Sequence, residues 1–384
     1  MRIGGGIISG EGKRSMGYSK YFHSNTLFCS HPEGIAQTVA CDADLYGIPT
    51  PAEYFENIFS SCSTHEECRE KVNSLMSRVR GGYAVAVMRD GHLFLFRDPA
   101  GKKSLFYDGK GCASEGKALS FPPVSVHPGE LLCMTHGSLF RHVFNTIPTC
   151  NPETLGTALE ESMSACTEKD AALLFSGGID SALLAALSDI PVITCGIEGS
   201  PDMRFARQAA DLLQKDHISI SIHPQDIAQA LPEVMNILEN KTLMHIEIGL
   251  LMYFVCREWD GSILISGQGA DELFGGYYKY EKAFSQKTPI REMMKADFHS
   301  MACGLERDGF IAERFHKKIR YPYLDIPVIE QAQGIPTSLL FEPQRKAFLR
   351  SVAEWFSIPH EIVVKPKKAL QYGSGFHKIV RKML

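Results

Sequence analysis

Apolar and polar positions in the first part of the chain fall into short runs that turn signals separate. The apolar run Gly82–Met88 precedes the turn Arg89–His92, which has Asp-Gly at its centre, and the apolar run Leu93–Phe96 follows. Two such runs around an Asp-Gly turn predict an antiparallel β-hairpin. Similar hairpin patterns surround Asp108-Gly109 and His136-Gly137. Helical patterns are few here, at residues 51–60 and 65–79.

From about residue 149 the pattern changes to alternating strands and helices. Asn151 and Pro152 mark the start of a helix, because Asn is a favoured N-cap and Pro fits the first turn. Strand patterns follow at 171–175, 192–195, 217–222 and 262–265, and helical patterns at 181–189, 201–215, 225–239 and 246–258. This alternation predicts a parallel, doubly wound sheet, and the segment 285–384 is expected to be mostly helical.

The change of pattern predicts two domains joined by the Pro148–Pro152 segment. Residues 1–148 are expected to form an α+β domain rich in antiparallel sheet, and residues 149–384 an α/β domain. The sequence has no internal repeat and no low-complexity segment.

Composition narrows the class of protein. The formal net charge is −4. A surface that binds nucleic acid usually shows as a basic domain, and the charge of this sequence gives no indication of one. The 11 cysteines form no CxxC pair, which favours reduced thiols in a cytoplasmic protein, and the sequence pattern completes no metal site around Cys62 and Cys68. The segment Met1–Gly6 lacks the apolar stretch of a signal peptide, and the longest apolar run, Ile248–Cys256, is too short to span a membrane.

The most specific chemical signal is the loop Ser176-Gly177-Gly178-Ile179-Asp180-Ser181, which follows a buried strand pattern. Its glycines let backbone N–H groups approach an anion, and the N-terminus of the next helix adds free donors. Ser176 and Ser181 can donate hydroxyl hydrogen bonds. A carboxylate beside a phosphate needs a cation between them, so Asp180 is interpreted as a Mg²⁺ ligand. The alternative is an ordinary strand–turn–helix; a Walker A loop is absent.

This loop resembles the PP-loop of the N-type ATP pyrophosphatases. Within that group the chain is similar to the asparagine synthetase and β-lactam synthetase family. The further segments that resemble this family are Gly196–Asp202, Ser266–Gly276, Arg320–Asp325 and Lys365–Gln371. Together they span about 170 to 375, so the resemblance covers the second domain and implies its PP-loop synthetase fold.

The resemblance implies an ATP-dependent, AMP-forming ligase. A substrate carboxylate attacks the ATP α-phosphate to give an acyl-adenylate and pyrophosphate, and an amine then displaces AMP. ATP and Mg²⁺ are the implied cofactors, with Asp180 and Asp271 as metal ligands. Lys367 matches the lysine that faces charge on the phosphates and adenylate, and Asp202 is a candidate substrate contact. The positions implied to bind ATP are Phe175, Ser176, Gly177, Gly178, Ser181, Cys195, Ser266 and Gly267.

The first domain resembles the family's class II glutaminase domain, an N-terminal nucleophile (Ntn) fold. The matching segments are Arg97–Gly101, Ala113–Leu119 and Pro128-Gly129. That activity needs a cysteine as the mature N-terminus, whereas position 2 is Arg2. Asp42–Tyr46 stands where the family has NGEIYN, so the oxyanion asparagine is missing too. The domain is therefore expected to be an inactive glutaminase kept as a scaffold or partner surface.

Two further positions depart from the family within the second domain. Gln268 stands where asparagine synthetases carry Glu and β-lactam synthetases carry Tyr; because Gln cannot act as a base, it can only orient the amine. Glu247 falls roughly where an arginine near the substrate carboxylate is expected. A cationic or amine-bearing substrate, a shifted alignment and a buried ion pair are all compatible with Glu247, and His245 is expected to be an ordinary packed histidine.

The leading hypothesis is therefore a ligase that joins a small-molecule carboxylate to ammonia or another amine without hydrolysing glutamine. The alternatives are a nucleotide-binding regulatory homologue without turnover, and a PP-loop enzyme of RNA or sulfur modification. No membrane partner is expected. The sequence leaves open the identity of both substrates, and whether the chain forms a homodimer or uses a separate ammonia-supplying partner.

Overall fold

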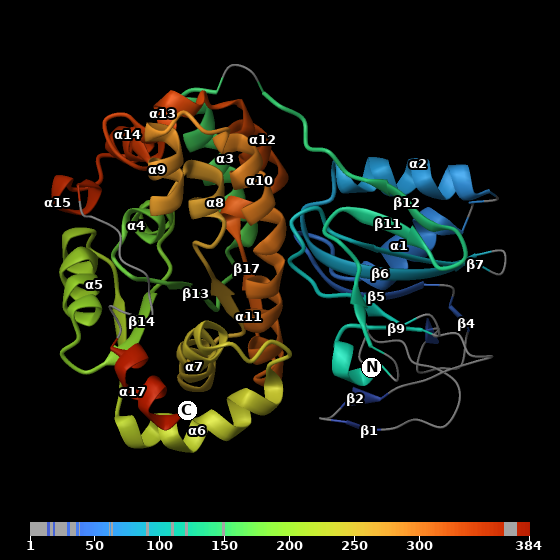
Figure 1. Cartoon of the computed structure of the whole chain (residues 1–384), viewed down its shortest axis with the longest axis horizontal. Coiled ribbons are helices and arrows are strands. Elements are labelled where there is room, and N and C mark those ends of the chain that lie inside the picture. Colours follow the sequence, from blue (N-terminus) through green and yellow to red (C-terminus); the bar gives the residue numbers. More distant parts are fainter. Residues whose placement is uncertain are drawn as a thin grey trace. The chain divides into compact units, whose positions relative to one another are not determined.

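The computed structural model describes residues 39–364 and 375–384, apart from residues 61, 63, 90, 91, 109, 110, 120, 121, 148 and 149. It also describes four two-residue strands near the N-terminus, β1 (Arg14–Ser15), β2 (Tyr18–Ser19), β3 (Cys29–Ser30) and β4 (Ala36–Gln37). The chain forms two compact units, Met1–Phe144 and Asn145–Leu384. Figure 1 shows the elements of both units.

The first unit is built on an antiparallel sheet of five strands in the order β12-β11-β7-β6-β5. Its strands are β5 (Val39–Leu45), β6 (Gly81–Arg89), β7 (His92–Arg97), β11 (Glu130–Cys133) and β12 (Gly137–Arg141). A smaller sheet has the order β10-β8-β9, with β8 (Phe106–Tyr107), β9 (Cys112–Ala113) and β10 (Val124–Ser125). The three expected hairpins are confirmed as the antiparallel pairs β6–β7, β8–β9 and β11–β12.

Two helices accompany this sheet, α1 (Pro51–Phe59) and α2 (His65–Met76), and η1 (Gly116–Ala118) is a short 3₁₀ turn. Phe55 and Phe59 of α1 are buried against the aromatic side chains of the sheet, with ring centroids of Phe59 and Phe96 5.7 Å apart. This aromatic packing gives the first unit a hydrophobic core of its own.

The second unit is built on a parallel sheet of five strands in the order β15-β14-β13-β16-β17. The strands are β13 (Ala171–Leu174), β14 (Val192–Ile197), β15 (His217–Ile222), β16 (Ile263–Ile265) and β17 (Lys318–Arg320). The expected parallel, doubly wound arrangement is confirmed for this unit, because the strand order reverses at β13. Four of its strands match predicted strand patterns, whereas β17 lies in the segment expected to be helical.

Helices connect these strands and pack on them. Asn151 caps α3 (Pro152–Cys166) as expected, since its side chain accepts a hydrogen bond of 2.9 Å from the Thr154 N–H. The connecting helices are α4 (Ile179–Ala186), α5 (Pro201–Leu212), α6 (Pro224–Ile237) and α7 (Leu243–Glu258). In Figure 1, α5 lies beside β14, and α7 also packs on that strand.

The remaining elements that the structure describes in the second unit are helical apart from β17. The helical elements are α8 (Ala270–Phe274), α9 (Tyr278–Ser285), α10 (Ile290–Ser300), α11 (Ala302–Arg314), η2 (Pro322–Leu324), α12 (Ile326–Gly334), α13 (Thr337–Phe341), α14 (Ala347–Trp355), α15 (His360–Val363) and α17 (Phe376–Met383). Within the described part of the chain, no helix has the length and apolarity to cross a membrane.

Candidate active site

The two glycine-rich loops singled out from the sequence follow adjacent strands of the parallel sheet. β13 pairs with both β14 and β16, so the loop after β13 and the loop after β16 lie at the point where the strand order reverses. A Cβ built on Gly267 would lie 3.7 Å from Asp180 Cβ and 3.8 Å from the Ser181 nitrogen, so the two loops lie close together. Ligands of open α/β sheets bind at this place.

The loop Ser176–Ser181 is held by its own hydroxyl groups. Ser181 Oγ donates to the Gly178 carbonyl at 3.1 Å and accepts from the Ser176 N–H at 3.3 Å. Ser176 Oγ accepts from the Gly178 N–H at 3.3 Å. Gly177 has φ +70°, a conformation that favours glycine, and a Cβ there would lie 2.9 Å from the Phe205 ring. The fold thus presents a compact turn at the N-terminus of α4.

A lysine that the sequence pattern did not single out joins the two loops. Lys346 Nζ lies 2.5 Å from Asp180 Oδ1 and 2.7 Å from Asp271 Oδ1. The lysine is 2% exposed, and burial strengthens both ion pairs relative to pairs in water. Both aspartates assigned from the sequence as metal ligands therefore converge on one buried ammonium group.

Backbone geometry around Lys346 is closely fitted. Lys346 itself has φ +60°, just before α14 begins. A Cβ added to Gly276 would lie 1.8 Å from Asp271 Oδ1 and 2.4 Å from Lys346 Cε, so only glycine fits at that position. Gly276 also accepts a hydrogen bond of 3.0 Å from Arg345 Nη1. A side chain at this position would therefore shift the aspartate or the lysine from the positions they have here.

A buried tyrosine donates a hydrogen bond to the backbone of the first loop. Tyr323 Oη donates to the Asp180 carbonyl at 2.9 Å. Burial, followed by the charges of Asp180 and Asp271, raises the pKa of Tyr323 well above its usual value. Tyr323 therefore stays protonated and remains a hydrogen-bond donor at any pH at which the protein functions.

Gln268 is fixed by an ion pair on α11. Its Nε2 donates to Asp308 Oδ2, and Arg307 pairs with both oxygens of the same carboxylate at 2.7 and 2.9 Å. The carboxylate accepts, so the amide nitrogen must face Asp308 and the amide oxygen must face away. Among the described residues, nothing donates a hydrogen bond to the buried Oε1 of Gln268. Burial and the Arg307 charge lower the pKa of nearby His245.

Two of the residues implied to bind ATP lie directly after β13 and on β14. Phe175 is buried directly after β13, its N–H donates to the Ile193 carbonyl at 2.7 Å, and its ring lies 6.5 Å from that of His217. Cys195 lies on β14, and burial raises the pKa of its thiol. Ser266 Oγ accepts from the Gln268 N–H at 3.3 Å and so shapes the second loop. These positions lie at or near the edge of the sheet where the loops meet.

Other residues singled out from the sequence lie on α7, α5 and β17 of the second unit. Glu247, 1% exposed on α7, has its Oε1 2.7 Å from His377 Nδ1 of α17, within hydrogen-bond distance. Asp202 lies half-buried in the first turn of α5. Arg320 pairs with Glu168 and the Cys166 carbonyl. Lys367 lies outside the described residues, so its expected role stays a prediction.

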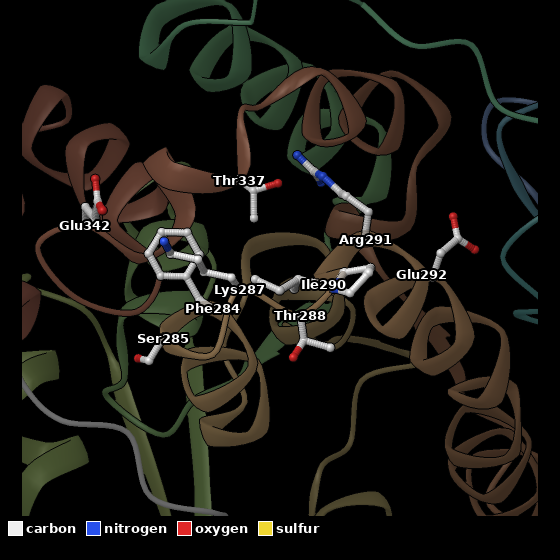
Figure 2. Close-up of a pocket in the computed structure, with 10 residues that line it drawn as sticks. Phe284, Ser285, Lys287, Thr288, Ile290, Arg291, Glu292, Thr337 and Glu342 are labelled. Carbon is white, nitrogen blue, oxygen red and sulfur yellow. The ribbon is translucent and has the colours of Figure 1, made fainter.

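A cavity of about 730 Å³ lies apart from these residues. Figure 2 shows Phe284, Ile290 and Thr337 among the side chains around it. None of its lining residues belongs to the two loops or to the Lys346 cluster. Arg291 of this cavity donates to the Ile335 carbonyl and thereby joins α10 to the end of α12. The residues that line the cavity are therefore not those that surround Asp180.

Comparison with protein families gives a match to asparagine synthase, over residues 154–318 and 280–384. This match covers more than half of the chain and includes both loops and Lys346. It coincides with the second unit, within which all the contacts of the candidate active site are made.

Individual relatives agree with this match. A Methanocaldococcus jannaschii protein assigned as a glutamine-hydrolyzing asparagine synthetase is 31% identical over 255 residues, covering 55% of this chain and 47% of that protein. The human glutamine-hydrolyzing asparagine synthetase is 30% identical over 237 residues, covering 54% and 40%. The Brassica oleracea protein of that name is 26% identical over 344 residues, covering 75% and 57%. The chain spans about half the length of the curated relatives it matches.

Two solved structures show weaker similarity. NMN synthetase from Francisella tularensis has 17% identity and a TM-score of 0.30, covering 56% of this chain and 72% of that one. NH3-dependent NAD synthetase from Campylobacter jejuni has 17% identity and a TM-score of 0.29, covering 58% and 78%. These values are too low to carry an inference about fold or function.

Proposed function

The chain belongs to the asparagine synthase family, and from this premise we propose that it is an ATP-dependent, AMP-forming amide ligase. The observation that carries the proposal is the convergence of Asp180 and Asp271, one from each loop, on Lys346. An adenylating site must hold a polyphosphate and neutralise the charge of departing pyrophosphate. Anion-binding loops, carboxylates and a buried cation at one edge of the sheet meet both needs.

The loop Ser176–Ser181 is proposed to bind the phosphates of ATP. The start of α4 offers backbone N–H donors, and the hydroxyl groups of Ser176 and Ser181 can turn from their internal hydrogen bonds toward phosphate oxygens. Lys346 directs two of its three donors to the aspartates, and the third is proposed to donate to a phosphate oxygen. Lys367 is proposed as a second cation for the phosphates and the adenylate.

The carboxylate pair also fits a magnesium ion. Asp180 and Asp271 offer hard oxygen donors from two loops, and each lies within 2.7 Å of the same cationic group. Mg²⁺, when bound, would neutralise charge on the phosphates and polarise them for attack by the substrate carboxylate. In this proposal Tyr323 keeps Asp180 in position through its hydrogen bond to the backbone.

Gln268 is proposed to orient the incoming amine. Its amide oxygen is a buried acceptor, and Asp308 and Arg307 fix the direction in which it points. Such an oxygen can accept an N–H of ammonia or of another amine, but it cannot remove a proton. A second group must therefore take the proton as the amide bond forms and AMP leaves.

The first unit is proposed to be an Ntn-type glutaminase domain without activity. Its antiparallel sheet supports the resemblance, and Asp42, which falls in the segment where the family has NGEIYN, is instead paired with Lys103 Nζ at 2.9 Å. Ammonia or an amine would then come from solution or from a separate partner. Asp202 and Glu247 stay proposed contacts of the small-molecule substrates.

ATP–pyrophosphate exchange with candidate carboxylates tests the proposal. Exchange with aspartate would favour asparagine formation, and exchange with another acid alone would exclude it. Asp180→Ala should abolish exchange, while an exposed-site control, Asp189→Ala, should leave it unchanged. ATP binding without exchange for any acid would support a regulatory nucleotide-binding protein instead.

The nitrogen donor is tested separately. Ammonium should support turnover in the unmodified protein, glutamine should not, and Arg2→Cys should not create glutamine hydrolysis. Turnover with glutamine would contradict the proposed inactive first domain.

A further inference from the structure

Three potential metal ligands meet in the first unit. None of them belongs to the candidate active site of the second unit. His92, Cys133 and His136 place one imidazole nitrogen or thiol sulfur each so that the three atoms lie within 4.8 Å of one another. Cys133 is buried, His92 is half-buried and His136 is exposed. The thiol is thus the most buried of the three groups, and the two imidazoles are more exposed to solvent.

Two hairpins bring these ligands together. Cys133 ends β11 and His136 lies in the turn before β12, so the pair has a Cys-x-x-His spacing, and the His136 N–H donates to the Cys133 carbonyl at 3.1 Å. His92 begins β7, which pairs with β11, and the Met134 N–H donates to the Leu93 carbonyl at 2.9 Å. The sequence pattern did not reveal these three residues as a set of metal ligands, because one of them precedes the other two by about forty residues.

The spacing agrees with coordination of a single ion. Cys133 Sγ and His136 Nδ1 are 3.3 Å apart. Tetrahedral Zn²⁺ with ordinary bond lengths separates a bound sulfur from a bound nitrogen by about 3.5 Å. Thiolate and imidazole are also the donors that Zn²⁺ prefers over carboxylate and carbonyl oxygens.

Thr135 provides the competing explanation. Its hydroxyl lies 2.8 Å from His92 Nδ1, 3.2 Å from Cys133 Sγ and 2.9 Å from His136 Nδ1. The hydroxyl can donate its proton to one of these atoms and accept hydrogen bonds from an N–H or S–H of the others, so it can also link the cluster. A hydrogen-bonded cluster would depend on this hydroxyl, whereas a bound cation would satisfy the thiolate and both imidazoles without it.

We propose that His92, Cys133 and His136 form a Zn²⁺ site that fastens the start of β7 to the β11–β12 turn. Binding converts the Cys133 thiol to a thiolate and releases its proton to solvent. Three protein ligands leave the fourth position to water. The proposal concerns the first unit alone and does not depend on the ligase activity.

Zinc content of the full chain, purified without a polyhistidine tag or chelator, tests this site. We expect about one Zn²⁺ per chain, and Co²⁺ should give the charge-transfer band of a thiolate ligand. His136→Ala and Cys133→Ser should weaken Zn²⁺ binding at least about tenfold. The matched controls His127→Ala and Cys303→Ser, which change an exposed imidazole and an exposed thiol, should bind as the parent does.

Thr135→Val separates the two explanations. Retained Zn²⁺ binding in this variant supports the metal site, whereas loss of binding in Thr135→Val together with retention in His136→Ala would overturn it. The absence of zinc binding by the unmodified chain would also overturn it. His136 is exposed, so His136→Ala keeps the test informative if Cys133→Ser does not fold. ATP–pyrophosphate exchange should be unchanged in His136→Ala, which separates this outcome from the fate of the proposed ligase activity.

Discussion

Lys346 shows how one residue can hold a site together. It is almost fully buried, has a left-handed backbone conformation and contacts an aspartate from each glycine-rich loop. Without its charge, two carboxylates would face each other in a partly desolvated place. Such repulsion would separate the loops or require another cation.

Lys346→Met tests this role, since it keeps the unbranched chain apart from the terminal atom and removes the charge. ATP–pyrophosphate exchange should fall by about 100-fold or more, as when a donor to developing charge is removed. Lys282→Met, at an exposed position of α9, is the control. Full exchange in Lys346→Met, with only a lower melting temperature, would limit Lys346 to a structural role.

The sequence singled out Asp180 from its loop and Asp271 from the family resemblance, but not the lysine between them. Each aspartate belongs to a loop whose glycines and preceding strand form a recognisable pattern. Lys346 follows Asp180 by 166 residues and precedes a helix without any local motif. Asp308, which orients Gln268, is hidden for the same reason, because it belongs to an ordinary amphipathic helix. Long-range contacts of this kind need the folded chain.

At the scale of elements, hydrophobic patterning predicted the hairpins of the first unit and four parallel strands of the second. It did not predict β17, a three-residue edge strand within a helical region. So short a strand has no periodicity to recognise, and its pairing with β16 depends on tertiary structure. The loops after β13 and β16 could be placed at one edge because parallel strands end on the same side.

Gly276→Ala tests the fit of the second loop. The added methyl group would collide with Asp271 Oδ1, so the aspartate or the loop must move. A displacement of about 1 Å in a reacting site can lower the rate about 100-fold, and a similar loss of exchange is expected. Gly309→Ala is the matched control, because an added Cβ there meets nothing within 4 Å. That helical change should raise stability by about 0.5–1 kcal/mol.

His377→Ala tests how α17 is attached to α7. Removing the imidazole leaves the buried Glu247 carboxylate without this partner, at a cost of about 1–3 kcal/mol. Amide hydrogen exchange in α17 should therefore accelerate about 10- to 100-fold. Lys378→Ala, next to it and exposed, should leave the exchange rates unchanged. Unchanged exchange in His377→Ala would favour a substrate-facing role for Glu247.

At the scale of the whole molecule, the two units have separate sheets and separate clusters of polar side chains. The first has the His92, Cys133 and His136 cluster, and the second has both glycine-rich loops. Hydrophobic patterning and turn signals predict two units of different class. The change of pattern near residue 149 arises because antiparallel hairpins and strand–helix alternation leave different hydrophobic periods.

Hydrogen exchange measured by mass spectrometry should show which unit binds ATP and which binds Zn²⁺. Mg²⁺–ATP should slow exchange in peptides covering residues 173–181 and 265–276, because bound phosphate would occupy free N–H donors. Zn²⁺ should slow exchange around residues 92 and 133–137 only. Protection of residues 81–97 by ATP would contradict the assignment of nucleotide binding to the second unit.

The place of β13 in its sheet also has a consequence for synthesis of the chain on the ribosome. β14 can pair with one edge of β13 soon after both are made, but the other edge waits for β16, since Ala171 pairs with Ile263. At ordinary elongation rates this delay lasts about 5–20 seconds. During that time a hydrophobic strand edge is available to other chains, so nascent chains are expected to need chaperones until β16 emerges.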